Sequence, residues 1–260
     1  MICDSINWIY NINRNLPAGK GMSLASDYTK GRFTIQKSQM VINKNAVVLH
    51  SGGQDSTTCL MWAIKKFKKV YVISFDYGQR HNIELKSAKD ICKKLKLPHE
   101  TIDLTLLKKL TKNALTDKSV KITSGKKNGL PSTFVDGRNQ MFLTVAAIYA
   151  KRKGIPNLVT GVCQTDYSGY PDCREEFIKS LEKTLRLAME FPFKIHTPLM
   201  HLTKAQTIKL MQKLGGLPLL QYTHTCYEGA RPACGKCPAC KLRMKGFKEA
   251  GATDPLPYKK

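Results

Sequence analysis

The feature that most constrains this 260-residue chain is an apolar strand that runs directly into a glycine-rich turn and then a helix. The strand is the unbroken run at residues 46–49, which lacks the alternation of a half-buried strand and favours a parallel sheet covered on both faces. The turn reads S-G-G-Q-D-S-T-T over residues 51–58, and Asp55 and Ser56 open a helix expected to reach Lys66. This unit predicts an α/β fold.

The same alternation of strand and helix recurs along the chain. A second strand is expected at residues 70–75, a helix at about 81–95, a short third strand around Ile102, and a fourth strand at residues 157–162. This order predicts a Rossmann-like, doubly wound parallel sheet with helices on both faces. Further helices are expected over residues 139–153, 175–190, 202–214 and 242–250.

Composition divides the chain into three parts. Residues 1–40 are polar and show no sustained period, which predicts a disordered N-terminal extension, with Met40 as the candidate true start. Residues 41–220 carry the strand–helix alternation and predict the nucleotide-binding α/β domain, in which the Lys-, Thr- and Ser-rich stretch 105–130 is expected to be an insertion loop. Residues 221–260 predict a small cysteine module that ends in a basic helix.

The turn after the first strand has the chemistry of a phosphate-binding loop. Glycines let the backbone approach an anion closely, and the N–H groups and dipole of the following helix favour negative charge. The hydroxyls of Ser51 and Ser56 can donate further hydrogen bonds, and Asp55 can position Mg²⁺ or cap the helix. The turn is neither a Walker A loop nor G-x-G-x-x-G. A capped glycine turn is the plain structural alternative.

Four of the nine cysteines fall within fifteen positions: Cys226, Cys234, Cys237 and Cys240. An odd number of cysteines and a C-x-x-C-x-x-C run argue against a disulfide framework and for a metal site. Four thiolates complete a tetrahedron and leave no open position, which predicts structural zinc. An iron–sulfur cluster is the alternative, although the fuller ferredoxin signature is absent here.

Charge and hydropathy limit the possible partners. The formal net charge is +24, but lysines and arginines are spread along the whole chain, which favours a solvated surface over a nucleic-acid site. No apolar run approaches the ~20 residues that cross a bilayer, and the N-terminus lacks the features of a secretory signal. We therefore expect a cytoplasmic protein without a membrane partner.

Three further polar segments are richer in chemistry than a scaffold requires. Residues 76–81 follow the second strand, residues 137–139 precede a helix, and residues 166–174 follow the fourth strand. Because ligands bind at the carboxyl ends of strands in open α/β sheets, all three are candidates for a site. Each has a simpler alternative, as a turn, a cap or a satisfied polar cluster.

Taken together, the motifs resemble those of the 7-cyano-7-deazaguanine synthase family within the PP-loop ATP pyrophosphatases. The resemblance extends from Asn45 to Pro255 and rests on S-G-G-Q-D-S-T-T, F-D-Y-G-Q-R-H, F-V-D-G-R-N, D-Y-S-G-Y-P-D-C-R, T-P-L-x-x-L-T-K-A and C-Y-x-G…C-x-x-C-x-x-C-x-L-R. It implies an ATP-dependent ligase that converts 7-carboxy-7-deazaguanine and ammonia into a nitrile through adenylated intermediates. The product would feed queuosine and related pathways. It also implies a homodimer that acts on small molecules and requires no nucleic acid.

The resemblance also implies roles for individual residues. ATP would be bound, with Mg²⁺, by His50, Ser51, Gly52, Gly53, Gln54, Asp55, Ser56, Thr57, Thr58, Cys59 and Leu60. One structural zinc per chain would be held by Cys226, Cys234, Cys237 and Cys240. The candidate catalytic residues are Ser51, Asp55, Ser56, Arg138 and Arg174. The deazaguanine or its adenylate would be contacted by Arg80, Arg138, Tyr170, Asp172 and Arg174. One departure is Asp136, which stands where the family usually has proline in F-V-P-G-R-N.

Two other functions fit parts of the sequence. A tRNA-thiolating PP-loop enzyme would need catalytic cysteines near its substrate, and Cys163 and Cys173 are the candidates. A nucleic-acid-binding zinc module would need aromatic and basic residues interleaved around the cysteines, and only Tyr227 and Phe247 lie near them in sequence.

Overall fold

The computed structural model describes residues 44–79, 83–111, 113–117, 119, 126–127, 130–165 and 169–259. The extension expected over residues 1–40 lies outside this range, as do Arg80, His81 and residues 166–168 of the polar segments. The described residues from Lys44 onward belong to one compact unit, and the boundary predicted at residue 220 stays a prediction.

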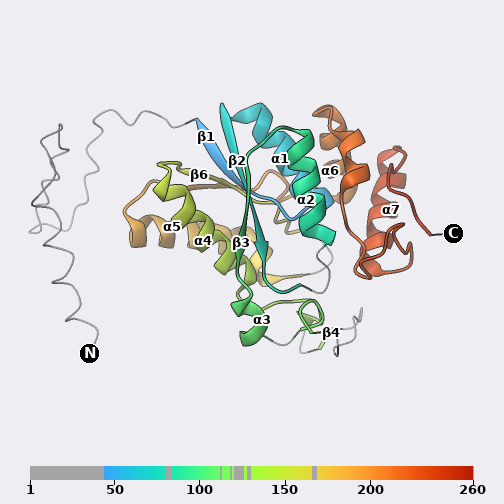
Figure 1. The fold of residues 1–260 in the computed structure, drawn as a ribbon, viewed down its shortest axis with the longest axis horizontal. Coiled ribbons are helices and arrows are strands. Elements are labelled where there is room, and N and C mark those ends of the chain that lie inside the picture. The colour runs from blue at the N-terminus through green and yellow to red at the C-terminus, as the bar shows by residue number, and fades with distance from the viewer. Residues whose placement is uncertain are drawn as a thin grey trace, which may run out of the picture. The chain divides into compact units, whose positions relative to one another are not determined.

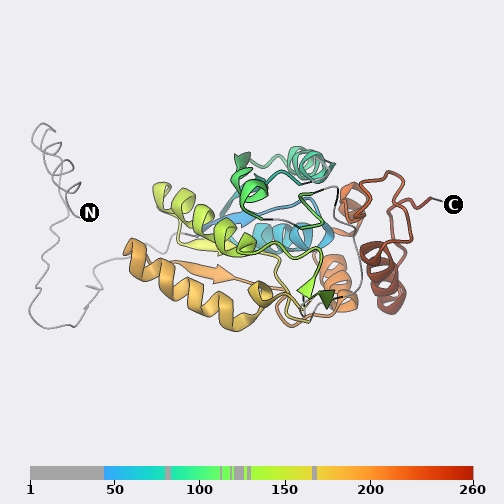
Figure 2. The same ribbon diagram turned by 90° about the horizontal axis from the view of Figure 1, so that it is seen from below.

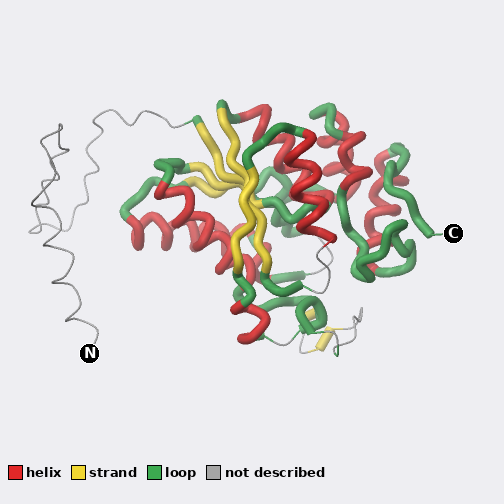
Figure 3. The backbone as a smooth tube through the Cα atoms, in the orientation of Figure 1, coloured by secondary structure: helices red, strands yellow, loops and turns green. Residues whose placement is uncertain are grey.

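A five-stranded parallel sheet forms the centre of the described structure (Figures 1 and 3). Its strand order is β3-β2-β1-β6-β7, with β1 in the middle. Register is continuous across the centre, since Val47 of β1 pairs with Tyr71 on one side and Leu158 on the other. The strands are β1 (Asn45–Leu49), β2 (Lys69–Asp76), β3 (His99–Asp103), β6 (Asn157–Val159) and β7 (Lys194–His196).

Helices cover both faces of the sheet, as the unbroken apolar strands predict (Figure 2). Val47 and Leu49 point into one core with α4 (Arg138–Arg152) and α5 (Glu175–Met189). Ala46 and Val48 point into the opposite core with α1 (Gln54–Lys66) and α2 (Ile83–Lys94). The doubly wound α/β fold expected from the sequence is therefore confirmed.

The C-terminal part packs on this domain through two crossing helices, α6 (Lys204–Lys213) and α7 (Pro238–Ala250). Ile208, Met211 and Phe247 fill their contact, together with a short 3₁₀ segment, η3 (Leu217–Tyr222). Gly246 allows the close crossing, because a Cβ there would lie 2.8 Å from the Cβ of Lys204. The basic helix expected from residue 242 begins at Pro238, whose fixed φ suits a first helical turn.

Several elements differ from the sequence-based expectation. The stretch 105–130 is not a continuous loop, since it contains α3 (Leu106–Leu110) and β4 (Lys126–Lys127), which pairs with β5 (Leu130–Pro131). Strand β6 ends at Val159, three residues earlier than expected, and η2 (Pro171–Cys173) is a further short helical turn. Strand β7 was not expected, because three residues are too few to show a period.

Among the described residues, no helix is both long and apolar enough to cross a bilayer.

The N-terminus of α6 supplies a test of local stability. Thr203 Oγ1 accepts a hydrogen bond from the Gln206 backbone N–H at 3.2 Å, and Gln206 Oε1 accepts one from the Thr203 N–H at 2.8 Å. This is a reciprocal capping box. We expect Thr203→Ala to lower the free energy of unfolding by about 1 kcal/mol in urea denaturation. Thr203→Ser keeps the hydroxyl and should restore most of the loss; equal midpoints for all three proteins would contradict this role.

Candidate functional site

The candidate site lies where the strand order of the sheet reverses. From β1 the chain proceeds outward through β2 and β3 on one side and later through β6 and β7 on the other. Crevices at such a switch point bind ligands at the carboxyl ends of the strands. Here a cavity of about 400 Å³ opens between the segments that follow β1 and β6, and Ser51 and Gly161 are among its lining residues. Its volume lies in the range of ligand pockets.

Two glycines allow this cavity to close around the loop after β1. Gly52 has φ +80, and a Cβ there would lie 2.3 Å from the backbone oxygen of Glu84, so α2 packs directly on the loop. At Gly161, after β6, a Cβ would lie 3.2 Å from the backbone nitrogen of Ser56. The sequence thus uses glycine where two other backbones approach the loop.

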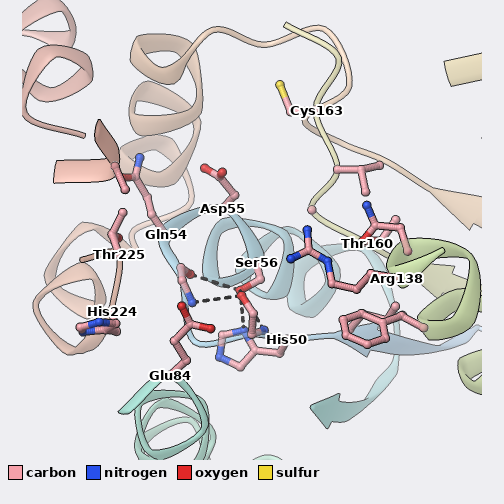
Figure 4. A pocket seen from close by; sticks show the side chains of 18 of the residues that line it. His50, Gln54, Asp55, Ser56, Glu84, Arg138, Thr160, Cys163, His224 and Thr225 are labelled. Atoms are coloured by element: carbon pink, nitrogen blue, oxygen red, sulfur yellow. Dashed lines mark hydrogen bonds between the residues drawn. The ribbon is translucent and has the colours of Figure 1, made fainter. Parts of the chain in front are cut away.

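A network of hydroxyls holds the loop in shape (Figure 4). Ser56 Oγ accepts from the Ser51 N–H at 3.1 Å, donates to the Gly53 carbonyl at 3.2 Å, and lies 3.2 Å from His50 Nδ1. Because the Ser56 proton points to Gly53, we assign the His50 proton to Nδ1. Burial, with a smaller contribution from His99, lowers the pKa of His50 to about 3. The ring is therefore neutral at physiological pH.

Three buried polar atoms in this region have no hydrogen-bond partner within the described part of the chain: His50 Nε2, Gln54 Nε2 and Asp55 Oδ1. All three residues line the cavity. Buried polar groups are nearly always paired in folded proteins, so unpaired ones in residues that line a common cavity are candidates for partners that a ligand supplies. The set offers one donor and two acceptors.

A lysine from a distant segment supplies positive charge at the loop. Lys204, the first residue of α6, lines the cavity and places its Nζ 2.5 Å from Asp55 Oδ2. Its side chain is only 15 % exposed. Sequence reasoning did not select Lys204, although it is the lysine of T-P-L-x-x-L-T-K-A. The signal was therefore present, but nothing in the sequence shows that this lysine lies beside the phosphate-type loop.

Arg138 faces the cavity from the first turn of α4. Its guanidinium lies 6.0 Å from the ring centre of Tyr77, whose pKa is raised to about 12 by burial, partly opposed by the arginine charge. Asp172 is buried and anchors the start of α4, because its carboxylate accepts from the Asn139 N–H at 3.3 Å. Asp136, the departure from the family pattern, is exposed.

The predicted site residues divide into three groups. Those that line the cavity are His50, Ser51, Gly53, Gln54, Asp55, Ser56, Arg138 and Tyr170. Those that are buried without lining the cavity are Gly52, Thr57, Thr58, Cys59, Leu60 and Asp172. Arg174 is exposed at the N-terminal end of α5 and is not among the lining residues.

The four clustered cysteines come together as the spacing predicts. The Sγ atoms of Cys226, Cys234, Cys237 and Cys240 all lie within 4.8 Å of one another. The Sγ atoms of Cys234 and Cys240 are 3.9 Å apart, close to the ~3.8 Å that tetrahedral Zn–S bonds impose. Burial acts to raise the pKa of Cys234, but backbone N–H groups of Cys237 and Lys236 outweigh it and lower this pKa to about 7. The cluster fits a single metal ion.

This cysteine module also forms part of the cavity wall. Cys226 lines the cavity, and the adjoining His224 donates its backbone N–H to the Gly52 carbonyl at 2.9 Å. The module is anchored by Arg243, which is 1 % exposed and forms two 2.8 Å hydrogen bonds to the Asp254 carboxylate. A third bond runs from Arg243 to Thr223 Oγ1 at 2.7 Å. The cysteine cluster is thus connected to the loop through residues 224–226, from the hydrogen bond of His224 to the first cysteine, Cys226.

The fold, the loop at the switch point and the four-cysteine cluster define a PP-loop type of nucleotide-using α/β protein. The family model for queuosine biosynthesis protein QueC matches residues 45–251. The chain belongs to the QueC family.

Curated relatives agree with this assignment. A 7-cyano-7-deazaguanine synthase of Clostridium botulinum (strain Langeland) is 54% identical over 209 residues, which is 79% of this chain and 95% of the relative. One of Clostridium acetobutylicum is 53% identical over 215 residues, which is 81% of this chain and 97% of the relative. Among solved structures, a 4-thiouridine synthetase–RNA complex with bound ATP has 18% identity and a TM-score of 0.47, and the match covers 80% of this chain and 50% of that one.

The close contact at Gly52 can be tested against a matched glycine. Gly154 also has a positive φ, +64, but no atom lies within 4 Å of an added Cβ. Both alanine variants should carry the cost of a left-handed residue, about 1–2 kcal/mol. Only Gly52→Ala should also displace Glu84, so we expect it to lose more stability in urea denaturation and to bind ATP more weakly by calorimetry. Equal losses in stability and equal ATP binding would show that the contact is unimportant.

Metal binding by the cysteine cluster is a separate prediction. We expect purified protein to contain one metal ion per chain by plasma mass spectrometry, and Cys240→Ser to lose most of it. Cys92→Ser removes a buried thiol outside the cluster and should retain the metal. Because the cluster adjoins the loop, chelation should also lower the melting temperature. Metal content unchanged in Cys240→Ser would exclude the cluster as the binding site.

Proposed function

We propose that this protein is a 7-cyano-7-deazaguanine synthase, an ATP- and ammonia-dependent carbon–nitrogen ligase that acts on 7-carboxy-7-deazaguanine. Membership of the QueC family and the names of its relatives support the reaction class. The observation that carries the proposal at the site is the shared cavity, which joins a loop with unpaired buried polar atoms to Arg138. A nucleotide and a carboxylate substrate must meet in such a space.

In the proposed reaction the loop binds the phosphates of ATP. The first backbone N–H groups of α1 and the Ser51 hydroxyl would contact the anion, while Ser56 keeps the loop in shape through its own hydrogen bonds. The Lys204 ammonium would neutralise part of the anion's charge. Asp55 Oδ1, a buried carboxylate oxygen without a partner in the described structure, fits the oxygen preference of Mg²⁺ and would hold it. Magnesium, when bound, would offset phosphate charge as pyrophosphate leaves.

The chemistry needs positioning more than a protein nucleophile. A carboxylate is a poor electrophile, and its transfer to AMP makes it a good one, which ammonia then attacks to give an amide and AMP. A second ATP adenylates the amide oxygen and releases pyrophosphate. Loss of AMP, which carries that oxygen, and of the two nitrogen protons leaves the nitrile. We propose that Arg138 stabilises the negative charge that develops at the acyl oxygen, with Ser51 and Ser56 at the phosphate side.

We further propose that the four cysteines bind zinc with a structural role. Four thiolates leave no open coordination position, and their separations suit Zn–S bonds. Zinc would fix the chain from Cys226 to Cys240 and thereby the cavity wall beside the loop. Free thiols and ATP are both available in the cytoplasm, where we place the reaction. The family resemblance supports a homodimer, which light scattering would test.

The decisive experiment incubates purified protein with 7-carboxy-7-deazaguanine, ATP, Mg²⁺ and ammonium, followed by mass spectrometry. We expect a nitrile product together with AMP. AMP without nitrile would leave ATP use intact but require another acceptor, and thiolated tRNA would favour the alternative in which Cys163 and Cys173 act; both residues line the cavity. Zinc-loaded, folded protein that consumes no ATP would overturn the proposal.

Two arginines give a sharper test within this reaction. We expect Arg138→Ala to lower kcat/KM about 100-fold, because a bidentate donor to developing charge is lost, and Arg138→Lys to recover only part of it. Arg152→Ala, at the exposed end of the same helix, is the control. Arg174 stays a prediction, and unchanged turnover in Arg174→Ala would remove it from the reaction. Full activity in Arg138→Ala would exclude the role proposed for Arg138.

A further inference from the structure

The cavity has a second group of lining residues that the phosphate-binding loop does not explain. Tyr77 at the end of β2, Phe142 on α4, Tyr170 and Tyr227 all contribute aromatic rings to its wall. Tyr77 and Phe142 have ring centres 5.5 Å apart, and Phe142 also stacks on Phe75 at 4.4 Å. We call Tyr77, Phe142, Tyr170 and Tyr227 the aromatic wall. Such a surface suits the faces of a planar heterocycle.

One carboxylate belongs to the same part of the cavity. Glu84 lies on the first turn of α2, and Figure 4 shows its side chain projecting from that helix into the pocket. Its charge acts on two members of the aromatic wall, because burial raises the pKa of both Tyr77 and Tyr227 and the Glu84 charge adds a smaller contribution in the same direction. It also lies within electrostatic reach of Arg138. Glu84 is therefore a neighbour of both the aromatic wall and the arginine.

The Glu84 carboxyl is partly buried without a compensating partner in the described part of the chain, which is unfavourable for its charged form. It is half-buried, and among the described residues it forms no hydrogen bond and no ion pair. Burial raises its pKa to about 7, although the positive charge of Arg138 acts in the opposite direction. Its backbone is fixed, because its carbonyl oxygen is the atom that packs against Gly52. A carboxyl held in a cavity without hydrogen-bond partners can accept hydrogen bonds from a ligand.

The proposed reaction brings two heterocycles into this cavity, and they differ in what they offer such an acceptor. A guanine-type edge presents two adjacent donors, the ring N1–H and the 2-amino group. Adenine presents an amino group beside a bare N1 lone pair, which a carboxylate repels. A carboxylate can accept both guanine-type hydrogen bonds side by side. The residue thus has the chemistry to separate the deazaguanine substrate from the adenine of ATP.

We propose that the Glu84 carboxylate binds the N1–H and 2-amino groups of the deazaguanine ring and so selects the substrate, while the aromatic wall packs against the ring. The inference rests on the proposed function. Arg138, which acts on the acyl group attached to the five-membered ring, would then lie toward the other end of the same substrate. Glu84 is a binding residue in this arrangement and takes no part in bond formation.

The test compares the substrate with an analogue that lacks only the 2-amino group, 7-carboxy-7-deazahypoxanthine. We expect the wild type to prefer the natural substrate by about 100-fold in kcat/KM, because the analogue leaves one carboxylate oxygen without its donor. In Glu84→Gln this preference should fall below about 10-fold, mainly through a higher KM for the natural substrate. Glu84→Asp should keep part of the preference, and the exposed Glu176→Gln should keep all of it.

Other outcomes separate this inference from its alternatives. Unchanged discrimination in Glu84→Gln would overturn it. A raised KM for ammonium with unchanged discrimination would also overturn it and assign Glu84 to ammonia. Wild-type protein that converts neither compound would fail the proposed function instead, and calorimetric binding of the two compounds would still test Glu84.

The thermal stability of Glu84→Gln separates a binding role from a structural role, because the two roles predict opposite changes in melting temperature. The pKa of Glu84 rises from 4.5 to about 7 on folding, so between pH 4.5 and about 7 the folded protein binds more protons than the unfolded chain. The contribution of Glu84 to the free energy of unfolding therefore falls as the pH rises through this range. Tyr77, Tyr227 and Arg138 are the described groups that interact with it electrostatically. We expect Glu84→Gln to melt at or above the wild-type temperature at pH 8. A clear loss of stability there would mean that Glu84 holds the fold.

Discussion

The backbone of Gly52 is the point on which the site depends. Its positive φ turns the chain after β1, its missing Cβ admits the carbonyl of Glu84, and its own carbonyl accepts the N–H of His224. Three segments that are far apart in sequence therefore meet at one residue: the phosphate-binding loop, the first turn of α2, and the segment that leads into the cysteine module. The loop is therefore enclosed by backbone on two sides.

A second centre, at Arg243, explains how the C-terminal module becomes part of the cavity. Its guanidinium is almost fully buried and is paired with Asp254, which also accepts from the Tyr258 hydroxyl at 2.7 Å. Breaking such a buried pair by removing one partner leaves an uncompensated charge, which typically costs about 3–5 kcal/mol. The pair joins α7 to the chain after it and to Thr223, just before His224. The cysteine cluster and the ion pair thus hold the two ends of the segment that touches the loop.

Much of this arrangement could be predicted from the sequence, because apolar runs and glycine turns report local structure directly. The central strands, the loop, the cap at Thr203 and the cysteine cluster all follow from patterns a few residues long. What could not be predicted depends on distant segments. Lys204 reaches Asp55 across 149 positions of sequence, and Glu84 enters the cavity only because α2 packs on Gly52. The edge strand β7 is too short to carry a period, so its place is set by pairing with β6. Arg174 looked equivalent to Arg138 in sequence, yet only Arg138 faces the cavity.

The ion pair between Asp55 and Lys204 has a consequence for which anions the loop can accept. While the two side chains are paired, the lysine charge is held at Asp55 Oδ2, and a bare anion that draws the lysine away leaves that carboxylate without a compensating charge. A ligand that brings its own divalent cation replaces both partners together, with the cation at the carboxylate and the phosphate at the ammonium. The loop is thereby matched to a nucleotide and its cation as one unit. In a chain of formal net charge +24, this pairing offsets one positive charge at the loop itself.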